Sequence, residues 1–279
     1  MPADISIRAL NAAEIQLAVD WAAAEGWNPG LSDAACFGAV DPAGFLVAER
    51  DGEPAAVISV VNYDARFAFL GFYIVRPDLR GRGIGLRLWQ AGLAHAGGRT
   101  VGLDGVTAQQ ANYARQGFAF AYRNIRFAGT PAEGEAGGTV DLASLPLASI
   151  TASDARVFPA PRTAFLKAWI GTPGHVGRAL LRGGELAGWG VVRPARQGWK
   201  IGPLVAQDEA AAEAVFRALR AAAGGAPLVL DVPEPNAAAL ALARRHGLAP
   251  VFETARMYTG PIRPVDLARI YGVTSFELG

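Results

Sequence analysis

The sequence predicts an α/β protein built on a mixed sheet, in which two halves repeat the same order of elements. The expected strands come in consecutive runs before helices alternate with strands, which is typical of a mixed α+β sheet and not of a purely parallel one. A strand, a helix and a glycine–hydrophobe pair recur in the same order in both halves. The glycine-rich stretch 129–138 separates the halves and carries no apolar side chain larger than alanine.

The first half is expected to begin with a short strand at 5–8 and a helix that ends by Gly26. Asn11 and Glu14 have the spacing of a capping box, in which each residue's side chain bonds the other's backbone N–H. Apolar residues then recur at helical spacing, at Ile15, Val19 and Ala22.

Strands follow at 45–49 and 55–61, joined by the turn Asp51-Gly52, which favours a hairpin. A third strand at 67–75 is ended by Pro77, because the residue before proline is held in extended conformation. The remaining elements are a helix from Gly83 to about Ala96, a strand at 100–103, a second helix, and a strand at 118–127.

The repeat appears as Val101–Asp104, Arg115-Gln-Gly-Phe118 and Arg126-Phe127 in the first half, and as Leu228–Asp231, Arg245-His-Gly-Leu248 and Arg256-Met-Tyr258 in the second. This order indicates duplication of one unit. We expect domains at 1–130 and 139–279, joined by a linker at 131–138.

Composition narrows the class of partner. Hydrophobic residues make up 51% and charged residues 18%, and 26 basic against 25 acidic residues give a net charge of +1. This balance argues against nucleic acid or an anionic membrane as the main partner. One cysteine, Cys36, excludes an intrachain disulfide, and three dispersed histidines make a metal site improbable. Without a signal peptide or an apolar run of about 18 residues, a cytoplasmic protein is expected.

The segment from Val75 to Trp89 predicts an anion site. A strand ends, three glycines occur within five residues, and a helix begins. The first backbone N–H groups of a helix are unpaired and lie at the positive end of its dipole, and glycine lets an anion approach them closely. Arg80, Arg82 and Arg87 add positive charge, as a pyrophosphate requires.

Spacing excludes two familiar phosphate loops. A dinucleotide fingerprint beginning at Gly81 and Gly83 needs a third glycine where Leu86 stands, and a Walker A loop needs Gly-Lys-Ser/Thr. Arg80-x-x-Gly83-x-Gly85 instead resembles the Q/R-x-x-G-x-G/A signature of the GNAT superfamily, which binds the acyl-CoA pyrophosphate. A glycine-rich turn with surface arginines is the alternative.

The resemblance extends to Tyr113-x-x-x-Gly117-Phe118, at the family's spacing, and implies Tyr113 as the general acid that protonates the departing thiolate. A phenol stays protonated at neutral pH and can donate to sulfur, although packing on the sheet is an alternative role. Many relatives carry Asn seven residues earlier, where this chain has Val106. Gln109, Gln110 and Asn112 are the nearby polar residues. The implied acyl-CoA contacts are Ile74, Val75, Arg80, Gly81, Arg82, Gly83, Ile84, Gly85, Leu86, Asn112 and Tyr113.

The chain looks most similar to two-domain, YitH-like GNAT proteins, on segments 25–30, 103–113 and 201–205. In the second half, the strand Lys200–Val205 is followed by Asp208 and Glu209 in place of a glycine loop, and these acids would repel phosphate. We therefore expect a degenerate second GNAT-like domain that closes the acceptor side or forms an interface. Asp154, Arg162 and Trp169 are candidates for that surface.

The resemblance implies an N-acetyltransferase that moves an acetyl group from acetyl-CoA directly to a primary amine of a small molecule or peptide. Backbone N–H near Ile74 would hold the oxyanion. A non-catalytic acyl-CoA-binding protein and an unrelated α/β interaction protein are the alternatives. A monomer and a homodimer fit equally.

The strand 67–75 contains no carboxylate, so the usual position of the general base is empty. The candidates are Glu25, Asp33, Asp64 and Asp104, of which we favour Glu25 and Asp33. Caps or solvated carboxylates are the alternative role for each. Residues expected to bind the acceptor are Trp27, Asn28, Tyr63 and Phe72.

Overall fold

The computed structural model describes residues 5–132 and 137–279. The helices and strands of the first half are β1 (Ile5–Ala9), α1 (Ile15–Ala24), α2 (Asp33–Phe37), β2 (Phe45–Arg50), β3 (Glu53–Asn62), β4 (Phe67–Val75), α3 (Ile84–Ala96), β5 (Thr100–Val106), α4 (Gln110–Arg115) and β6 (Ala119–Gly129). Those of the second half are β7 (Thr139–Asp141), α5 (Leu147–Asp154), α6 (Thr163–Gly171), β8 (Val176–Arg182), β9 (Glu185–Pro194), β10 (Trp199–Ala206), α7 (Glu209–Ala222), β11 (Leu228–Pro233), α8 (Ala237–Arg245), β12 (Ala249–Tyr258) and β13 (Ile270–Gly272).

Local sequence signals determine several of these elements. Asn11 Oδ1 accepts the backbone N–H of Glu14 at 3.1 Å, and Glu14 Oε2 accepts that of Asn11 at 2.8 Å, so the capping box before α1 is formed. Asp51 and Gly52 both have positive φ, as the tight β2–β3 turn requires. The expected mixed α/β fold is confirmed.

Helices cover both faces of the first half's strands. Phe45 and Val47 pack in one buried cluster with Ile15 and Val19 of α1. Leu46 and Ala48 point to the opposite face and pack in a second cluster with α3. This alternation follows from the two-residue period of a strand.

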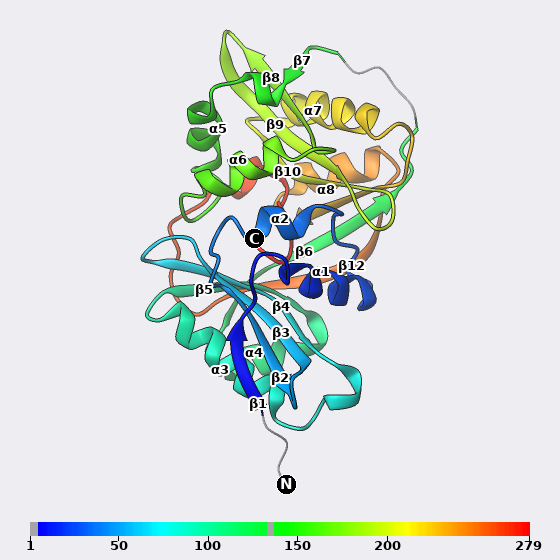
Figure 1. Ribbon diagram of the computed structural model, residues 1–279. Helices are drawn as coiled ribbons and strands as arrows, with labels where there is room; N and C mark the ends of the chain where they lie inside the picture. The colour runs from blue at the N-terminus through cyan, green and yellow to red at the C-terminus, as the bar shows by residue number, and fades with distance from the viewer. Residues whose placement is uncertain (1–4, 133–136) are drawn as a thin grey trace.

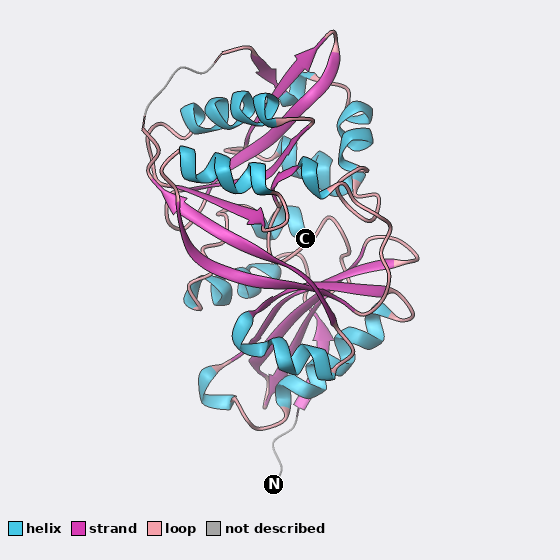
Figure 2. Cartoon of the chain, turned by 180° about the vertical axis from the view of Figure 1, so that it is seen from behind, coloured by secondary structure: helices cyan, strands magenta, loops and turns pink. Residues whose placement is uncertain are grey.

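The two halves share one sheet because β12 of the second half pairs with β5 of the first, and β6 of the first half pairs with β11 of the second. The strand order is β1-β2-β3-β4-β5-β12-β6-β11-β10-β9-β8-β7, with β13 paired to β10. β12 pairs with β5 from Gly102 to Val106, and β6 pairs with β11 from Asn124 to Gly129. Figures 1 and 2 show these long strands crossing the middle of the molecule, between the blue first half and the yellow second half of Figure 1.

The halves also have the same internal topology. β4 and β5 are parallel and connected through α3, and β10 and β11 are parallel and connected through α7. Each parallel pair follows a run of antiparallel strands. The repeat seen in the sequence is thus a repeat of element order. The segments 1–130 and 139–279 are separate in the chain, but their strands interleave in space.

Three buried ion pairs join the halves. Arg126 pairs with Asp231 at 2.6 Å, Arg256 with Asp104 at 2.6 Å, and Arg193 with Asp33 at 2.8 Å. Burial of a charge is costly unless it is paired and hydrogen-bonded, and these guanidinium–carboxylate contacts use both oxygens of each carboxylate. Their geometry fixes the two halves relative to each other.

Candidate active site

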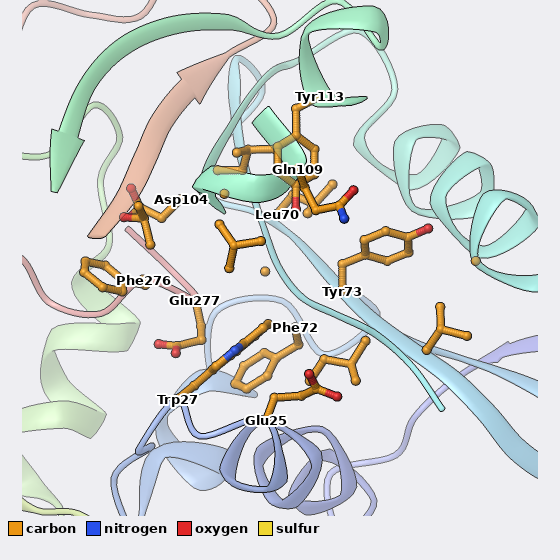
Figure 3. A pocket seen from close by; sticks show the side chains of 18 of the residues that line it. Glu25, Trp27, Leu70, Phe72, Tyr73, Asp104, Gln109, Tyr113, Phe276 and Glu277 are labelled. Carbon is orange, nitrogen blue, oxygen red and sulfur yellow. The ribbon is translucent and has the colours of Figure 1, made fainter. Parts of the chain in front are cut away.

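The main cavity lies where β4 and β5 separate. The two strands pair in parallel only from Phe67 to Leu70, opposite Thr100 to Leu103, and diverge beyond that point. A cavity of about 600 Å³ opens between Gly71–Val75 on one strand and Asp104–Val106 on the other. This is a usual size for a small-molecule site. Figure 3 shows Tyr113 and Gln109 on one side of it, with Trp27 and Glu277 on the other.

The glycine loop forms one end of this cavity, at the N-terminus of α3. Gly81 and Gly83 have φ of 76° and 79°, values that residues with a side chain rarely adopt. In the described part of the chain, no acceptor pairs with the backbone N–H groups of residues 81–86. These donors, together with the helix dipole, form an anion site of the expected kind.

The arginines near the loop are arranged unequally. Arg80 folds back, donating Nε to the Val75 carbonyl oxygen at 3.0 Å and Nη2 to Glu25. Arg87 donates to the Ile5 carbonyl oxygen at 3.2 Å. Arg82 is exposed beside the loop. Arg82 and Arg87 therefore keep positive charge at the surface next to the free N–H groups.

A bulge in β4 prepares the middle of the cavity. Phe72 and Tyr73 together oppose Ile58 of β3, because Val57 pairs with Ile74 and Ser59 with Gly71. Phe72 has φ of 48°. A bulge leaves backbone groups without ladder partners, so it offers N–H donors beside Ile74, where the oxyanion was expected.

Tyr113 of α4 lines the same cavity. Its ring lies directly against Gly105, where an added Cβ would come within 2.3 Å of it, and it stacks on Trp89 with ring centroids 5.8 Å apart. Burial, with the neighbouring Tyr73 phenol, raises the pKa of Tyr113 to about 12. The hydroxyl is therefore protonated at neutral pH and can act as a proton donor.

Comparisons with known proteins agree with this geometry. The acetyltransferase (GNAT) family model matches residues 12–119, and an acetyltransferase (GNAT) domain model matches residues 150–272. Holothin acyltransferase from Pseudoalteromonas sp. (strain SANK 73390) is 32% identical over 269 residues, covering 95% of this chain and 92% of that protein. The chain belongs to the GNAT family. It is a two-domain GNAT protein and an acyl-CoA N-acyltransferase.

Solved structures show the same GNAT fold over the whole chain. An acetyltransferase-like protein from Pyrococcus horikoshii has a TM-score of 0.84 at 24% identity, covering 99% of this chain and 96% of that one. A GCN5-related N-acetyltransferase from Sphaerobacter thermophilus has a TM-score of 0.63 at 16% identity, covering 96% and 98%. A tandem GNAT protein from the clavulanic acid biosynthesis pathway has a TM-score of 0.62 at 17% identity, covering 92% and 99%.

The structure brings most of the expected acyl-CoA residues of this GNAT protein together. Ile74, Val75, Arg80, Gly81, Gly83, Gly85, Leu86 and Tyr113 all line the cavity. Arg82, Ile84 and Asn112 do not. Ile84 is 4% exposed in the core under α3, and the Asn112 side chain contacts Gln109 and Arg115. Gln109 and Val106 both line the cavity.

The candidate general bases have different surroundings in the structure, and only some of them border the cavity. Asp33 is fully buried away from the cavity. Burial opposes its ionisation, but Arg193 and Lys200 hold the pKa of Asp33 below its ordinary value, so it is a structural carboxylate. Asp64 accepts the N–H groups of Arg66 and Phe67 in a turn. Of the two favoured residues, only Glu25 borders the cavity, and its carboxylate is bonded to Arg80.

Asp104 borders the cavity from the end of β5, but both its oxygens are already bonded. Arg256 donates to Oδ1 at 2.9 Å and to Oδ2 at 2.6 Å, and Asn124 donates to Oδ1 at 2.7 Å. The pair joins β5 to β12, so Asp104 ties the two halves together at the edge of the site.

The expected acceptor residues divide in the same way. Trp27 lines the cavity, and Phe72 borders it, although its ring is 1% exposed and packs against Phe37 and Phe45. Asn28 is bonded to the backbone of Gln197 in the second half. The Tyr63 hydroxyl donates to the Leu278 carbonyl oxygen at 2.8 Å. Asn28 and Tyr63 therefore connect the halves and do not line the cavity.

Sequence reasoning missed the wall that the second half supplies. Phe252 and Thr254 of β12 and Phe276 and Glu277 of the C-terminal segment all line the cavity. The local sequence offers only a single acid in the segment Val273–Gly279. Their position depends on the strand exchange, which no local pattern reveals. The second half therefore supplies one wall of the cavity.

The second half lacks a loop like that before α3. Asp208 caps α7, and its side chain accepts the backbone N–H of Ala211 at 2.8 Å. Its carboxylate also pairs with Arg182. The N-terminus of α7 is thus occupied by the protein's own anion.

Among residues 5–132 and 137–279, no cluster of three or more His, Cys, Asp or Glu side chains is arranged to hold a metal ion. Nor does any helix in these residues combine the length and apolarity needed to cross a membrane.

Proposed function

We propose that this protein transfers an acetyl group from acetyl-CoA directly to a primary amine of a small molecule or peptide. The observation that carries the proposal is that the free N–H groups of residues 81–86, the bulge at Phe72–Tyr73 and the Tyr113 side chain open onto one cavity. A single cavity that holds both substrates permits direct attack without an acyl-enzyme intermediate.

The residues present fit acetyl-CoA as a cosubstrate. The loop would hold the pyrophosphate, because its glycines remove the side chains that would block approach to the N–H groups. Gly85 is also required for space, since an added Cβ would lie 2.6 Å from the Tyr73 hydroxyl oxygen. β4 beyond Leu70 would pair with the pantetheine arm, and the bulge would place the thioester carbonyl beside Ile74.

Tyr113 is the proposed proton donor to the leaving thiolate. Tyr73 also lines the cavity, and burial raises its pKa. The Tyr73 hydroxyl lies against Gly85 at the start of α3, whereas Tyr113 projects from α4 across from Trp27 and Glu277 (Figure 3). This position favours Tyr113 for the thiolate.

Residues 1–130 would carry the acyl-CoA loop and Tyr113, and residues 139–279 would supply the other side of the acceptor site. Phe252 and Phe276 give this side aromatic walls, and Trp27 of the first half adds a third aromatic side chain. We therefore expect acceptors in which the primary amine is attached to an apolar or aromatic body. Holothin is the first acceptor to test, because the curated relative is named for its acylation.

The proposal is tested by incubating the purified protein with acetyl-CoA and a panel of amines that includes holothin, an aralkyl amine and a peptide. Release of free thiol and the mass of the acetylated product are measured together. Acetylation of at least one amine is expected. Binding of acetyl-CoA by calorimetry with no acetylated product from any amine would favour a non-catalytic acyl-CoA-binding protein instead.

A further inference from the structure

The C-terminal segment Val273–Gly279 brings a carboxylate to the cavity that no part of the sequence analysis assigned. Glu277 is 3% exposed and lines the cavity opposite Tyr113 (Figure 3). Its Oε2 atom is buried and has no hydrogen-bond partner among the described residues. An unpaired buried carboxylate oxygen carries a desolvation cost that a bound cationic or N–H donor group would relieve.

The other charged side chains that line the cavity already have partners. Arg126 of β6 donates hydrogen bonds to both carboxylate oxygens of Asp231, and its Nη1 donates to the Trp27 carbonyl oxygen at 2.8 Å. Lys200 of β10 does not line the cavity; it lies 3.9 Å from Asp231 Oδ2, and its Nζ atom makes no hydrogen bond with the described residues. Across the cavity, Glu25 is bonded to Arg80 and Asp104 to Arg256. The charge of Glu277 interacts with those of Arg126 and Lys200, but no hydrogen bond joins Glu277 to either residue.

The segment that carries Glu277 is held on all sides. The Val273 N–H donates to the Asp231 carbonyl oxygen at 2.8 Å, and Arg162 Nη1 donates to Thr274 Oγ1 at 2.9 Å. The backbone at Glu277 passes so close to β4 that a Cβ on Gly71 would lie 2.2 Å from the Glu277 carbonyl oxygen. These contacts fix the backbone that carries the Glu277 carboxylate at the cavity, so the position of this group is set before substrate binds.

We propose that Glu277 is the general base that accepts the proton of the acceptor amine. The inference rests on the proposed function and supplies the carboxylate that β4 lacks. It also gives the second half a catalytic role, since Glu277 reaches the cavity of the first half only because the C-terminal segment packs on β4.

The acceptor enters as an ammonium ion beside Glu277 and gives it one proton, and the amine lone pair attacks the thioester carbonyl carbon. The C–N bond forms and the C–S bond breaks. The thiolate takes a proton from Tyr113, the second proton lost by nitrogen restores Tyr113, and the proton on Glu277 passes to solvent.

The test compares Glu277→Gln with the wild-type protein in the acetyl transfer assay. We expect kcat to fall about 100-fold or more at pH 7, while the affinity for acetyl-CoA by calorimetry stays within about twofold. The deficit should shrink at least tenfold as the pH approaches the pKa of the acceptor, because solvent then supplies neutral amine. The matched control is Glu185→Gln, the same change on an exposed hairpin far from the cavity.

Glu277→Asp keeps the charge and should retain at least about a tenth of the wild-type kcat. Three results would overturn the assignment: a Glu277→Gln variant as active as wild type, a deficit that stays constant with pH, or equal loss in both variants while both bind acetyl-CoA. If the wild-type protein itself acetylates no amine, the proposed function fails and the role of Glu277 falls with it.

Discussion

The hydroxyl of Tyr113 can deliver a proton because its surroundings keep it protonated. Burial raises its pKa to about 12, so the phenol does not ionise over the range in which the protein would work. The ring lies against Gly105 and stacks on Trp89. Position and protonation state are thus set by packing, not by a hydrogen-bonded partner.

We expect Tyr113→Phe to lower kcat by about 100-fold and to leave acetyl-CoA affinity within about twofold, because the ring contacts remain and only the donor is lost. Stopped-flow thiol release and calorimetry would measure the two effects. Since the donor titrates near pH 12, the wild-type rate should show no decline from Tyr113 ionisation up to pH 10. Wild-type turnover by the variant would remove the assignment.

Lys200 is 2% exposed, so its side-chain ammonium group is removed from water. Burial, helped by the charge of Arg126, lowers its pKa from 10.5 to about 8. Between these values the unfolded chain binds the proton more tightly than the folded protein, so this group makes the protein more stable as pH rises from 8 to 10.5. Below pH 8 its destabilising effect is fully present.

The free energy of unfolding of the wild type should therefore rise by roughly 3 kcal/mol, relative to Lys200→Met, between pH 7 and pH 10.5. Urea denaturation of both proteins at several pH values would measure this difference. Parallel pH dependences of the two curves would show that Lys200 does not titrate in this window.

The sequence predicted those cavity residues whose neighbours are close in the chain. It misplaced or missed the residues whose contacts are distant in the chain. Tyr113 and the loop glycines were found because their spacing lies within one strand–helix unit. Asp33 looked like a base beside Trp27, but Arg193, its partner, lies 160 positions away. Glu277 was missed because a single carboxylate in the segment 273–279 could not be assigned to the cavity until that segment was found packed on β4.

Helices α3 and α7 show at the scale of elements how two copies of one unit separate in function. Both follow the first strand of a parallel pair, so both present an N-terminus at the equivalent edge. α3 keeps its N–H groups free behind two glycines of positive φ, whereas α7 is capped by Asp208. A single capping carboxylate converts an anion site into a closed helix end.

We expect Gly83→Glu to weaken acetyl-CoA binding at least 100-fold in calorimetry, because it puts a negative charge at the pyrophosphate site. The variant also places a side chain at a φ of 79°. Gly224→Glu is the matched control, since Gly224 has a φ of 61° and open space around it but lies after α7. Equal loss of affinity in both variants would show that the effect comes from general backbone strain.

The boundaries of the helices and strands were largely predictable, because caps, turns and the alternation of apolar residues depend on residues that are close together in the sequence. The expected strand at 67–75 coincides with β4, and the expected hairpin around Asp51-Gly52 is present. The bulge at Phe72 was not predictable, because it depends on how β4 meets β3. The divergence of β4 from β5 that opens the cavity likewise depends on tertiary pairing.

At the scale of the whole molecule, the exchange of β6 and β12 couples the halves more strongly than a surface contact would. Separating them would break the β5–β12 and β6–β11 ladders and expose the buried pairs of Arg126, Arg193 and Arg256 with their carboxylates. Breaking a buried ion pair costs on the order of 3–5 kcal/mol when one charge is left unpaired.

A protease site inserted in the expected linker at 131–138 should therefore leave the protein intact after cleavage. We expect the two fragments to co-elute in size-exclusion chromatography and to unfold in one calorimetric transition. A matched uncleaved sample of the same protein is the control. Two separate transitions, or fragments that elute apart, would mean that each half is stable without the other's strand.

The exchanged strands also bear on how such a protein can evolve. A gene copy that has lost its own ligand is ordinarily free to decay or to be deleted. Here a truncation before residue 139 would remove β12 from β5 and both neighbours of β6, leaving β5 with an open edge and β6 without a strand partner, which invites aggregation. Loss of the second half is therefore costly even though the N-terminus of α7 is closed by its own carboxylate, and the second half can also contribute side chains to the cavity, as Phe252 and Glu277 do.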